Sequence, residues 1–92
     1  MTDKIHCAHI LVKTEVRAKE ILDRINKGEK FSALAIEYSI DPGSAKRGGD
    51  LGTFGRGMMV KEFERAAFDL QKGQVSGIVK TQFGYHIIKR LE

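Results

Sequence analysis

The segment IHCAHILV, residues 5–12, carries apolar or β-branched side chains on both of its alternating faces. A strand that is apolar on both faces is typical of the centre of a sheet, where each face is covered. A second apolar segment, GYHII at residues 84–88, lies near the other end of the chain. We therefore expect the two segments to be neighbouring strands of one small sheet.

The stretch HILV at residues 9–12 of the first segment and the second segment each place one histidine, His9 or His86, inside an apolar run. A buried imidazole needs hydrogen-bond partners, because burying an unpaired polar group is costly. If the two segments are neighbouring strands, the two rings can satisfy each other. The sequence thus predicts a polar cluster of two histidines inside the sheet, and this cluster is the first candidate for a functional site.

The residues between the two segments follow helical and strand patterns. Apolar spacing predicts a helix over residues 15–27, with Thr14 as its N-cap and Gly28 just after its end. A shorter helix over residues 31–38 is expected to be ended by Pro42. The remaining predicted elements are a short strand at 50–54, a helix at 60–70, and a hairpin of strands 75–80 and 85–91 around a four-residue connection, 81–84. This order, β-α-α-β-α-β-β, predicts an α+β fold.

Length and composition set limits on function. The 92 residues have room for one domain, over residues 1–92, and no apolar run is long enough to cross a membrane. The net charge of +4 comes without a dense basic run interleaved with aromatics, which argues against nucleic-acid binding. Cys7 is the only cysteine, so an intrachain disulfide is impossible and zinc would lack its usual thiolates. Residues 1–4 lack the apolar core of a signal peptide, so the cytoplasm is the simplest compartment, with export by another route left open.

Three separated motifs point to a family. They read HILVK at residues 9–13, DPGSAKRGGDLG at residues 41–52 and FGYHII at residues 83–88. In this order, and in a chain of this size, they closely resemble the parvulin-type peptidyl-prolyl cis/trans isomerases. The resemblance covers essentially the whole chain and implies a four-stranded antiparallel sheet wrapped by about four helices, in the order β-α-α-α-β-α-β-β. It also implies prolyl isomerase activity without cofactor or metal. We expect the protein to be a monomer.

The resemblance assigns roles to individual residues. His9 and His86 match the family's paired histidines, and Asp41 matches the position that holds either cysteine or aspartate. The residues that match the lining of the family's proline pocket are Leu51, Met59, Phe63 and Phe83. Met59 is chosen over its neighbour Met58 because only one of the two is expected to face the pocket.

Each of these residues also has a purely structural interpretation. Helical spacing alone favours core packing for Phe63. The two histidines could simply hold two strands in register, and both roles are compatible. Asp41 before Pro42 is typical of a residue whose side chain caps a turn. The two interpretations of Asp41 remain open at this point.

Other motifs carry less weight. Cys7 and His9 share one strand face, but no third orienting group or oxyanion hole accompanies them, which argues against a Cys–His hydrolase. Gly48 and Gly49 follow basic residues, yet they lack the order of a phosphate-binding loop and precede a strand, so tight turns explain them better. His6 points to the other face of the first strand and is expected to be a partly solvated structural residue.

The absence of an insertion after the first strand bears on the substrate. Some parvulins owe phosphate specificity to an inserted basic loop there, whereas here Lys13 is followed at once by Thr14 and the first helix. We therefore expect no strict requirement for phosphoserine or phosphothreonine, although Lys13, Lys46 and Arg47 could favour an acidic residue before proline. The predicted function is X-Pro isomerisation in unfolded or flexible protein segments. The alternative is a non-catalytic peptide-binding or chaperone module that uses the same groove.

Overall fold

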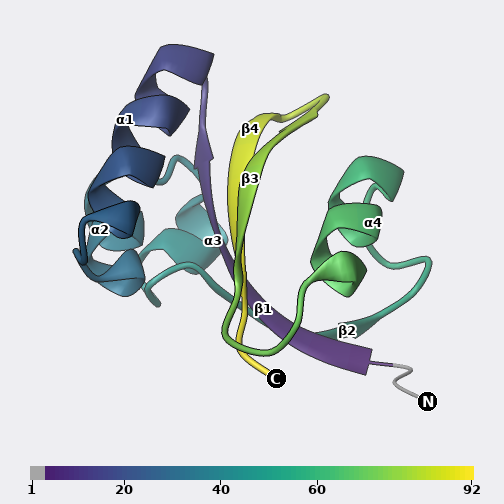
Figure 1. The fold of residues 1–92 in the computed structure, drawn as a ribbon. Coiled ribbons are helices and arrows are strands. Elements are labelled where there is room, and N and C mark those ends of the chain that lie inside the picture. The colour runs from purple at the N-terminus through teal and green to yellow at the C-terminus, as the bar shows by residue number, and fades with distance from the viewer. Residues whose placement is uncertain (1–3) are drawn as a thin grey trace.

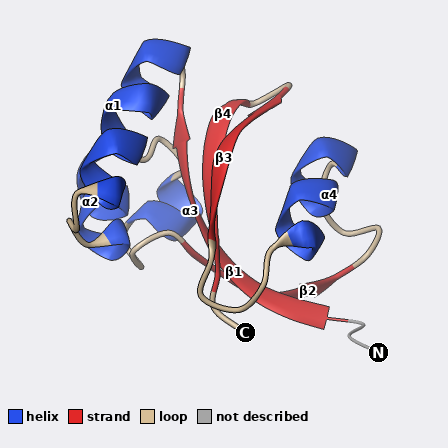
Figure 2. Ribbon diagram, in the orientation of Figure 1, coloured by secondary structure: helices blue, strands red, loops and turns tan. Residues whose placement is uncertain are grey.

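The computed structural model describes residues 4–92, so the expectation that residues 1–3 belong to no signal peptide lies outside the described residues. The elements are β1 (Lys4–Val12), α1 (Glu15–Asn26), α2 (Phe31–Tyr38), α3 (Pro42–Ala45), β2 (Asp50–Gly55), α4 (Lys61–Asp69), β3 (Val75–Thr81) and β4 (Gly84–Arg90). They form one antiparallel sheet with the strand order β2-β1-β4-β3. Helices α1 and α2 cover one face of the sheet, and α4 covers the other (Figures 1 and 2).

The first strand is central, as its sequence predicts. β1 pairs with β2 on one side and with β4 on the other, and its register with β4 places Leu11 opposite His86 and His9 opposite Ile88. The expected sheet and the helix order implied by the parvulin resemblance are therefore confirmed.

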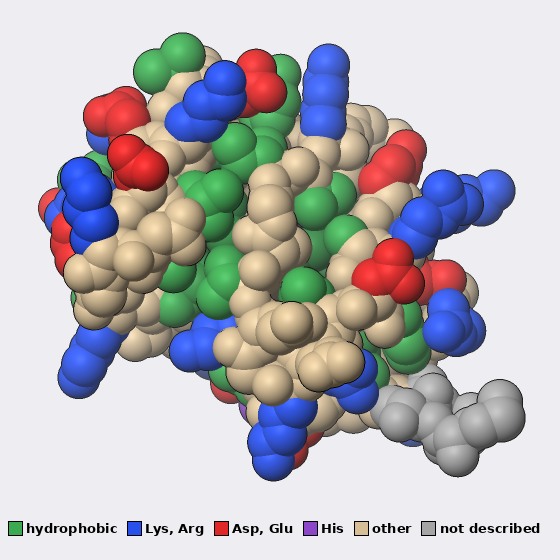
Figure 3. All heavy atoms as spheres, viewed as in Figure 1, with side chains coloured by type: hydrophobic (Ala, Val, Ile, Leu, Met, Phe, Trp, Pro, Cys, Tyr) green, Lys and Arg blue, Asp and Glu red, His purple; other side chains and the backbone are tan. Residues whose placement is uncertain are grey.

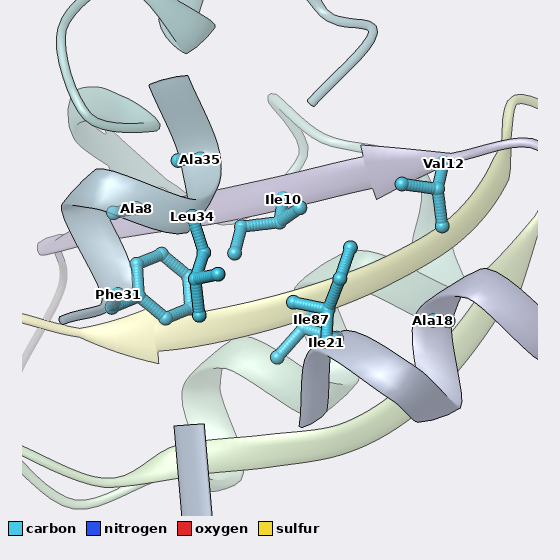
Figure 4. Packing of buried hydrophobic residues seen from close by; sticks show 9 residues of the cluster. All are labelled: Ala8, Ile10, Val12, Ala18, Ile21, Phe31, Leu34, Ala35 and Ile87. Carbon is cyan, nitrogen blue, oxygen red and sulfur yellow. The ribbon is translucent and has the colours of Figure 1, made fainter. Parts of the chain in front are cut away.

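The alternating faces of β1 enter two different hydrophobic clusters. Side chains of one face, such as Ile10, pack against α1 and α2 (Figure 4). Side chains of the opposite face, such as Ile5 and Cys7, pack against Phe63 and Ala67 of α4. Because both faces are covered, burial of apolar area stabilises the sheet from two sides, at roughly 25 cal/mol per Å².

Helix α3 differs from the periodicity analysis. Helix α2 already ends at Tyr38, and Pro42 does not end it but begins α3 as its first residue. Proline is well suited to this position, since its fixed φ matches the first helical turn and its missing amide hydrogen leaves no partner unsatisfied. A helix of four residues is too short to show an apolar period, so only the resemblance implied it.

The C-terminal hairpin is tighter than expected. Thr81 and Gly84 form a pair of the ladder, so the connection consists of Gln82 and Phe83 instead of four residues. Gly84 has a φ of +141°, and a Cβ atom there would lie 2.5 Å from the carbonyl oxygen of Val12. Because β4 comes this close to β1, the position requires glycine.

The turn between α3 and β2 is confirmed as a glycine-dependent tight turn. Gly49 has a φ of +87°, and its carbonyl accepts a hydrogen bond of 2.9 Å from the amide of His9. A Cβ atom on Gly49 would collide with the carbonyl oxygen of His9. The turn thus attaches α3 to β1 at the position of the first histidine.

The surface seen in Figure 3 carries Lys and Arg side chains interspersed with Asp and Glu side chains. Interspersed charges of both signs are typical of a solvated protein surface. Across residues 4–92 none of the helices has both the length and the apolar composition of a membrane span.

Candidate active site

A cavity of about 360 Å³ opens on the α4 side of the sheet. Residues from β1, β2, β4, α4 and three connecting segments line it, and they are His9, Leu11, Asp41, Leu51, Met58, Met59, Val60, Phe63, Phe83 and His86. The cavity brings together every site residue predicted from the sequence except Lys13. Lys13 is exposed just after β1 and is not among these lining residues.

The two histidines form one buried unit. His9 is 5% exposed and His86 is 3% exposed. Their Nδ1 atoms lie 3.0 Å apart, and their rings stack with centroids 5.2 Å apart. His86 pairs with Leu11, which lies two positions after His9 on β1, so both histidine side chains project from the same sheet face. The polar pair predicted from the sequence is confirmed.

A chain of hydrogen bonds assigns a tautomer to each ring. The Asp41 carboxylate can only accept, so His9 donates its Nε2–H to Asp41 Oδ2 at 2.8 Å. His9 Nδ1 then accepts from the Nδ1–H of His86. On the far side, Thr81 donates its hydroxyl hydrogen to His86 Nε2 at 2.6 Å, while its oxygen accepts the amide of Phe83. Both rings are neutral in this arrangement.

Electrostatics favour the same neutral pair. Burial, and after it the neighbouring His9, lowers the pKa of His86 from 6.5 to about 4. Burial also lowers the pKa of His9, although the hydrogen bond to Asp41 opposes this. The rings therefore carry no charge at neutral pH, and the negative charge of the site is the carboxylate of Asp41.

Asp41 faces the cavity at its polar end. Burial acts to raise the pKa of its carboxyl, but hydrogen bonds from His9 and Ser44 outweigh burial and leave the pKa lowered. Asp41 is also the N-cap residue of α3, yet within the described chain its side chain makes no capping hydrogen bond to this helix. The turn-cap interpretation is therefore correct for its backbone position, while its Oδ2 atom is directed to His9 and Ser44.

Phe63 belongs both to the core and to the cavity. It is 3% exposed and packs in the cluster with Cys7 and Phe54. Its ring also lies edge-on to the rings of both His9 and His86, with centroids 5.5 Å and 5.3 Å away. The two interpretations of Phe63 are thus compatible, because the ring closes the core and at the same time forms the floor of the cavity beside the histidines.

The prediction that only one methionine faces the cavity is wrong. Met58 and Met59 both line the cavity, although only one of them was expected to face it. They lie in the loop between β2 and α4, where no helical or strand period fixes opposite directions for successive side chains. Met58 is 67% exposed and Phe83 is 52% exposed, so apolar side chains reach into solvent at the mouth.

Several contributors were missed in the sequence. Leu11 lies two positions after His9 on the same strand face, a spacing that could have identified it as a lining residue. Val60 lines the cavity from the loop before α4, while Thr81 at the end of β3 and Ser44 in the four-residue α3 join its hydrogen bonds, and no local pattern predicts these contacts.

Two residues outside the cavity have structural roles. His6 lies on the opposite strand face, where its Nε2 is 2.6 Å from Asp50 Oδ1, as expected for a partly solvated structural residue. Burial raises the pKa of Cys7 to about 11, so its thiol stays protonated and is a poor nucleophile at neutral pH. The argument against a Cys–His hydrolase is thereby strengthened.

A four-stranded antiparallel sheet that holds a stacked histidine pair behind an apolar cavity defines a peptide-binding domain of the parvulin class. The sequence matches the family described as "Rotamase: PPIC-type PPIASE domain" over residues 9–92. This chain therefore belongs to the PPIC-type peptidyl-prolyl cis/trans isomerase family, the parvulins.

Known relatives have the same domain in proteins of different size. The chain is 64% identical over 86 residues to the foldase protein PrsA of Geobacillus kaustophilus. The matched region covers 94% of this chain and 31% of the relative. It matches the crystal structure of the peptidylprolyl isomerase PrsA from Bacillus cereus with a TM-score of 0.95 and 58% identity, over 98% of this chain and 35% of that one. It matches NmPin, the parvulin of Nitrosopumilus maritimus, with a TM-score of 0.89 and 55% identity, over 100% and 99% of the two chains. The chain thus spans about a third of the length of its first curated relatives and nearly all of a small parvulin.

Proposed function

We propose that this domain catalyses the cis/trans isomerisation of X-Pro bonds in flexible protein segments, without a covalent intermediate. The observation that carries this proposal is the apolar cavity, whose floor is Phe63 and whose polar end is Asp41 with the His9–His86 pair. A cavity of about 360 Å³ has room for a proline ring and its neighbouring peptide groups. Membership of the PPIC-type family and the foldase relatives support the same activity.

The chemistry follows from the electronic structure of the amide. The barrier to rotation is about 18–20 kcal/mol, because resonance gives the C–N bond partial double-bond character. Resonance also puts negative charge on the carbonyl oxygen, and this charge decreases as the amide twists. An apolar cavity that excludes water therefore favours the twisted amide over the planar one.

Asp41 strengthens this preference. Its carboxylate is ionised at neutral pH and is held toward the cavity by His9. A negative charge near the substrate carbonyl repels the planar amide, whose oxygen is more negative, more than it repels the twisted amide. We assign the catalytic roles to Asp41 with His9 and His86, and proline binding to Leu51, Met59, Phe63 and Phe83, with Met58 added from the structure.

We further propose that the domain does not require a phosphorylated residue before proline. Only Lys13 and Thr14 lie between the end of β1 and the start of α1, so this connection contains no inserted basic loop. Lys13 is exposed and would act only as a single charge that water and salt screen strongly. The cytoplasmic location and the monomeric state stay predictions, which cell fractionation and analytical ultracentrifugation would test.

Exchange NMR on short Xaa-Pro peptides tests the proposal, with Xaa as Leu, Glu or phosphoserine. Faster cis/trans exchange in the presence of the domain is expected for all three peptides. Acceleration of the phosphoserine peptide alone would contradict the absence of a phosphate requirement. No acceleration of any peptide would contradict catalysis.

The exposed rim favours a second candidate function. Met58 and Phe83 present apolar surface to solvent beside the cavity, as a module that holds extended chains would require. In the same NMR experiment, shifted peptide signals without faster exchange would identify such a non-catalytic binding module.

A further inference from the structure

Ser44 is a buried polar residue beside the cavity with no role yet assigned in isomerisation. It lies in α3 with 1% of its surface exposed, and its hydroxyl donates a hydrogen bond of 2.7 Å to Asp41 Oδ2. The same oxygen accepts the Nε2–H of His9 at 2.8 Å. Ser44 therefore contacts the reactive end of the site through one carboxylate oxygen, from outside the cavity lining.

Its position in the helix makes this contact unusual. Asp41 is the N-cap residue of α3, where an aspartate side chain normally accepts hydrogen bonds from the amides two or three residues later. Ser44 lies three residues after Asp41, but here its side chain donates to the Asp41 side chain and turns it toward His9. The nearby amide of Gly43 adds only a further stabilisation of the negative charge.

The backbone of Ser44 holds the same segment against the first strand. Its carbonyl oxygen accepts the amide of Gly49 at 2.8 Å, and the carbonyl of Gly49 in turn accepts the amide of His9 at 2.9 Å. Two routes therefore connect Ser44 to His9, one through side chains and one through the backbone. The second route fixes α3 in place, so that the first can fix the carboxylate.

We propose that Ser44 is a positioning residue that directs the Asp41 carboxylate away from helix capping and toward His9 and the cavity. This proposal rests on the isomerase activity proposed above. In this arrangement the Ser44 hydroxyl favours the ionised form of Asp41 and holds Oδ2 where it fixes the Nε2–H tautomer of His9. Without the hydroxyl, the carboxylate is free to turn to the first amides of α3, which is the usual conformation at an N-cap.

The test is the pH dependence of isomerisation by the variant Ser44→Ala. Asp41, His9 and His86 are the titratable side chains that line the cavity among the described residues, so the profile reports on this group. Removing a donor from the carboxylate raises its pKa, and the acid limb of kcat/KM should move up by about one pH unit. Activity at neutral pH should fall by about tenfold, because the carboxylate is no longer directed to the cavity.

Ser76→Ala is the matched control. Ser76 is also a buried serine, and its hydroxyl binds the backbone of Gly77 and Ile88, away from the cavity. The Ser76→Ala variant should lose stability as Ser44→Ala does but keep the wild-type pH profile of kcat/KM. An unchanged profile for Ser44→Ala, or an equal shift for both variants, would overturn the proposal.

A double-mutant cycle with Asp41→Ala separates a route through Asp41 from any other. Ser44→Ala should cause no further loss of activity when Asp41 is already alanine, and an additive loss would overturn the proposal. If Ser44→Ala fails to give a folded NMR spectrum, Ser44→Cys takes its place, with a smaller shift expected because the thiol is a weaker donor. An inactive wild-type protein would instead reject the isomerase proposal itself, so the two failures are distinguishable.

Discussion

Phe63 shows how one side chain serves packing and binding together. Its ring fills the space between Cys7 and Phe54 and also touches both histidines of the cavity. An aromatic ring suits both tasks, because it buries a large area and keeps a rigid shape with few rotatable bonds. Helical spacing favours core packing for Phe63 and the family resemblance favours a place in the pocket. In the structure Phe63 does both.

We predict that Phe63→Leu lowers kcat/KM by about tenfold, which corresponds to about 1.4 kcal/mol of transition-state stabilisation. Leucine leaves the floor of the cavity incomplete beside His9. The measurement is exchange NMR on a Leu-Pro peptide, together with thermal unfolding. Phe54→Leu is the control, because Phe54 is 2% exposed in the same cluster but is not among the lining residues. Equal losses of activity in both variants would show that stability alone is responsible.

The histidine pair ties stability to the site. His9 satisfies a nitrogen of His86 and an oxygen of Asp41 at the same time. Its removal leaves the buried Nδ1–H of His86 without a partner, which costs about 1–3 kcal/mol, whereas Asp41 Oδ2 keeps the hydroxyl of Ser44.

His9→Ala should therefore lower the melting temperature by roughly 4–8 °C for each kcal/mol lost, in addition to lowering activity. Differential scanning calorimetry at pH 7 measures this change. His6→Ala serves for comparison, since His6 makes one hydrogen bond at a half-exposed position on the other face. If His9→Ala melts at the wild-type temperature, the two rings are not energetically coupled.

At the scale of elements, the segment from α3 to the start of β2 positions the site. Within this segment, backbone hydrogen bonds hold Gly49 against both Ser44 and His9. The segment has little apolar surface of its own, so its conformation depends on glycine geometry and on contacts with β1. A small change in the conformation of this turn should therefore shift the position of His9.

Gly49→Ala should destabilise the domain more than Gly52→Ala does. Both glycines have positive φ, +87° and +76°, so both substitutions carry a cost of about 1 kcal/mol for the backbone conformation. Only at Gly49 would the added Cβ also collide with the His9 carbonyl, whereas no atom lies within 4 Å of the Cβ position at Gly52. Urea unfolding measures the difference, and equal losses would contradict the close approach of the turn to β1.

For the whole molecule, the buried neutral histidines couple folding to pH. The pKa of His86 is about 4 in the folded protein and 6.5 ordinarily, so the unfolded chain binds more protons between these values. The free energy of unfolding therefore rises with pH across this window. The stabilisation is complete above pH 6.5 and is lost as the pH falls toward 4, and the lowered pKa of Asp41 extends the loss to lower pH.

We predict that the wild-type free energy of unfolding falls by on the order of 3 kcal/mol between pH 7 and pH 4. In His86→Gln the slope should be smaller, because glutamine keeps hydrogen-bonding capacity but does not titrate. Chemical denaturation at a series of pH values gives both slopes. A variant His86→Gln with an unchanged slope would show that other groups cause the acid sensitivity.

The sequence by itself determined the central strand, α1, α2, the approximate range of α4 and the pairing of His9 with His86. These features depend on local periods and on the need of buried polar groups for partners, both of which can be read residue by residue. The motifs also indicated the parvulin family, and with it the four helices and most of the cavity lining.

Only the tertiary structure decided the direction of the Asp41 carboxylate, the shared presence of Met58 and Met59 in the cavity, and the contributions of Thr81 and Ser44. These side chains lie in or beside turns, where no repeating geometry fixes which way a side chain points. Their directions depend on contacts between segments far apart in the chain, such as the turn at Gly49 against β1. Such contacts exist only once the sheet has formed, and for this reason a local pattern cannot predict them.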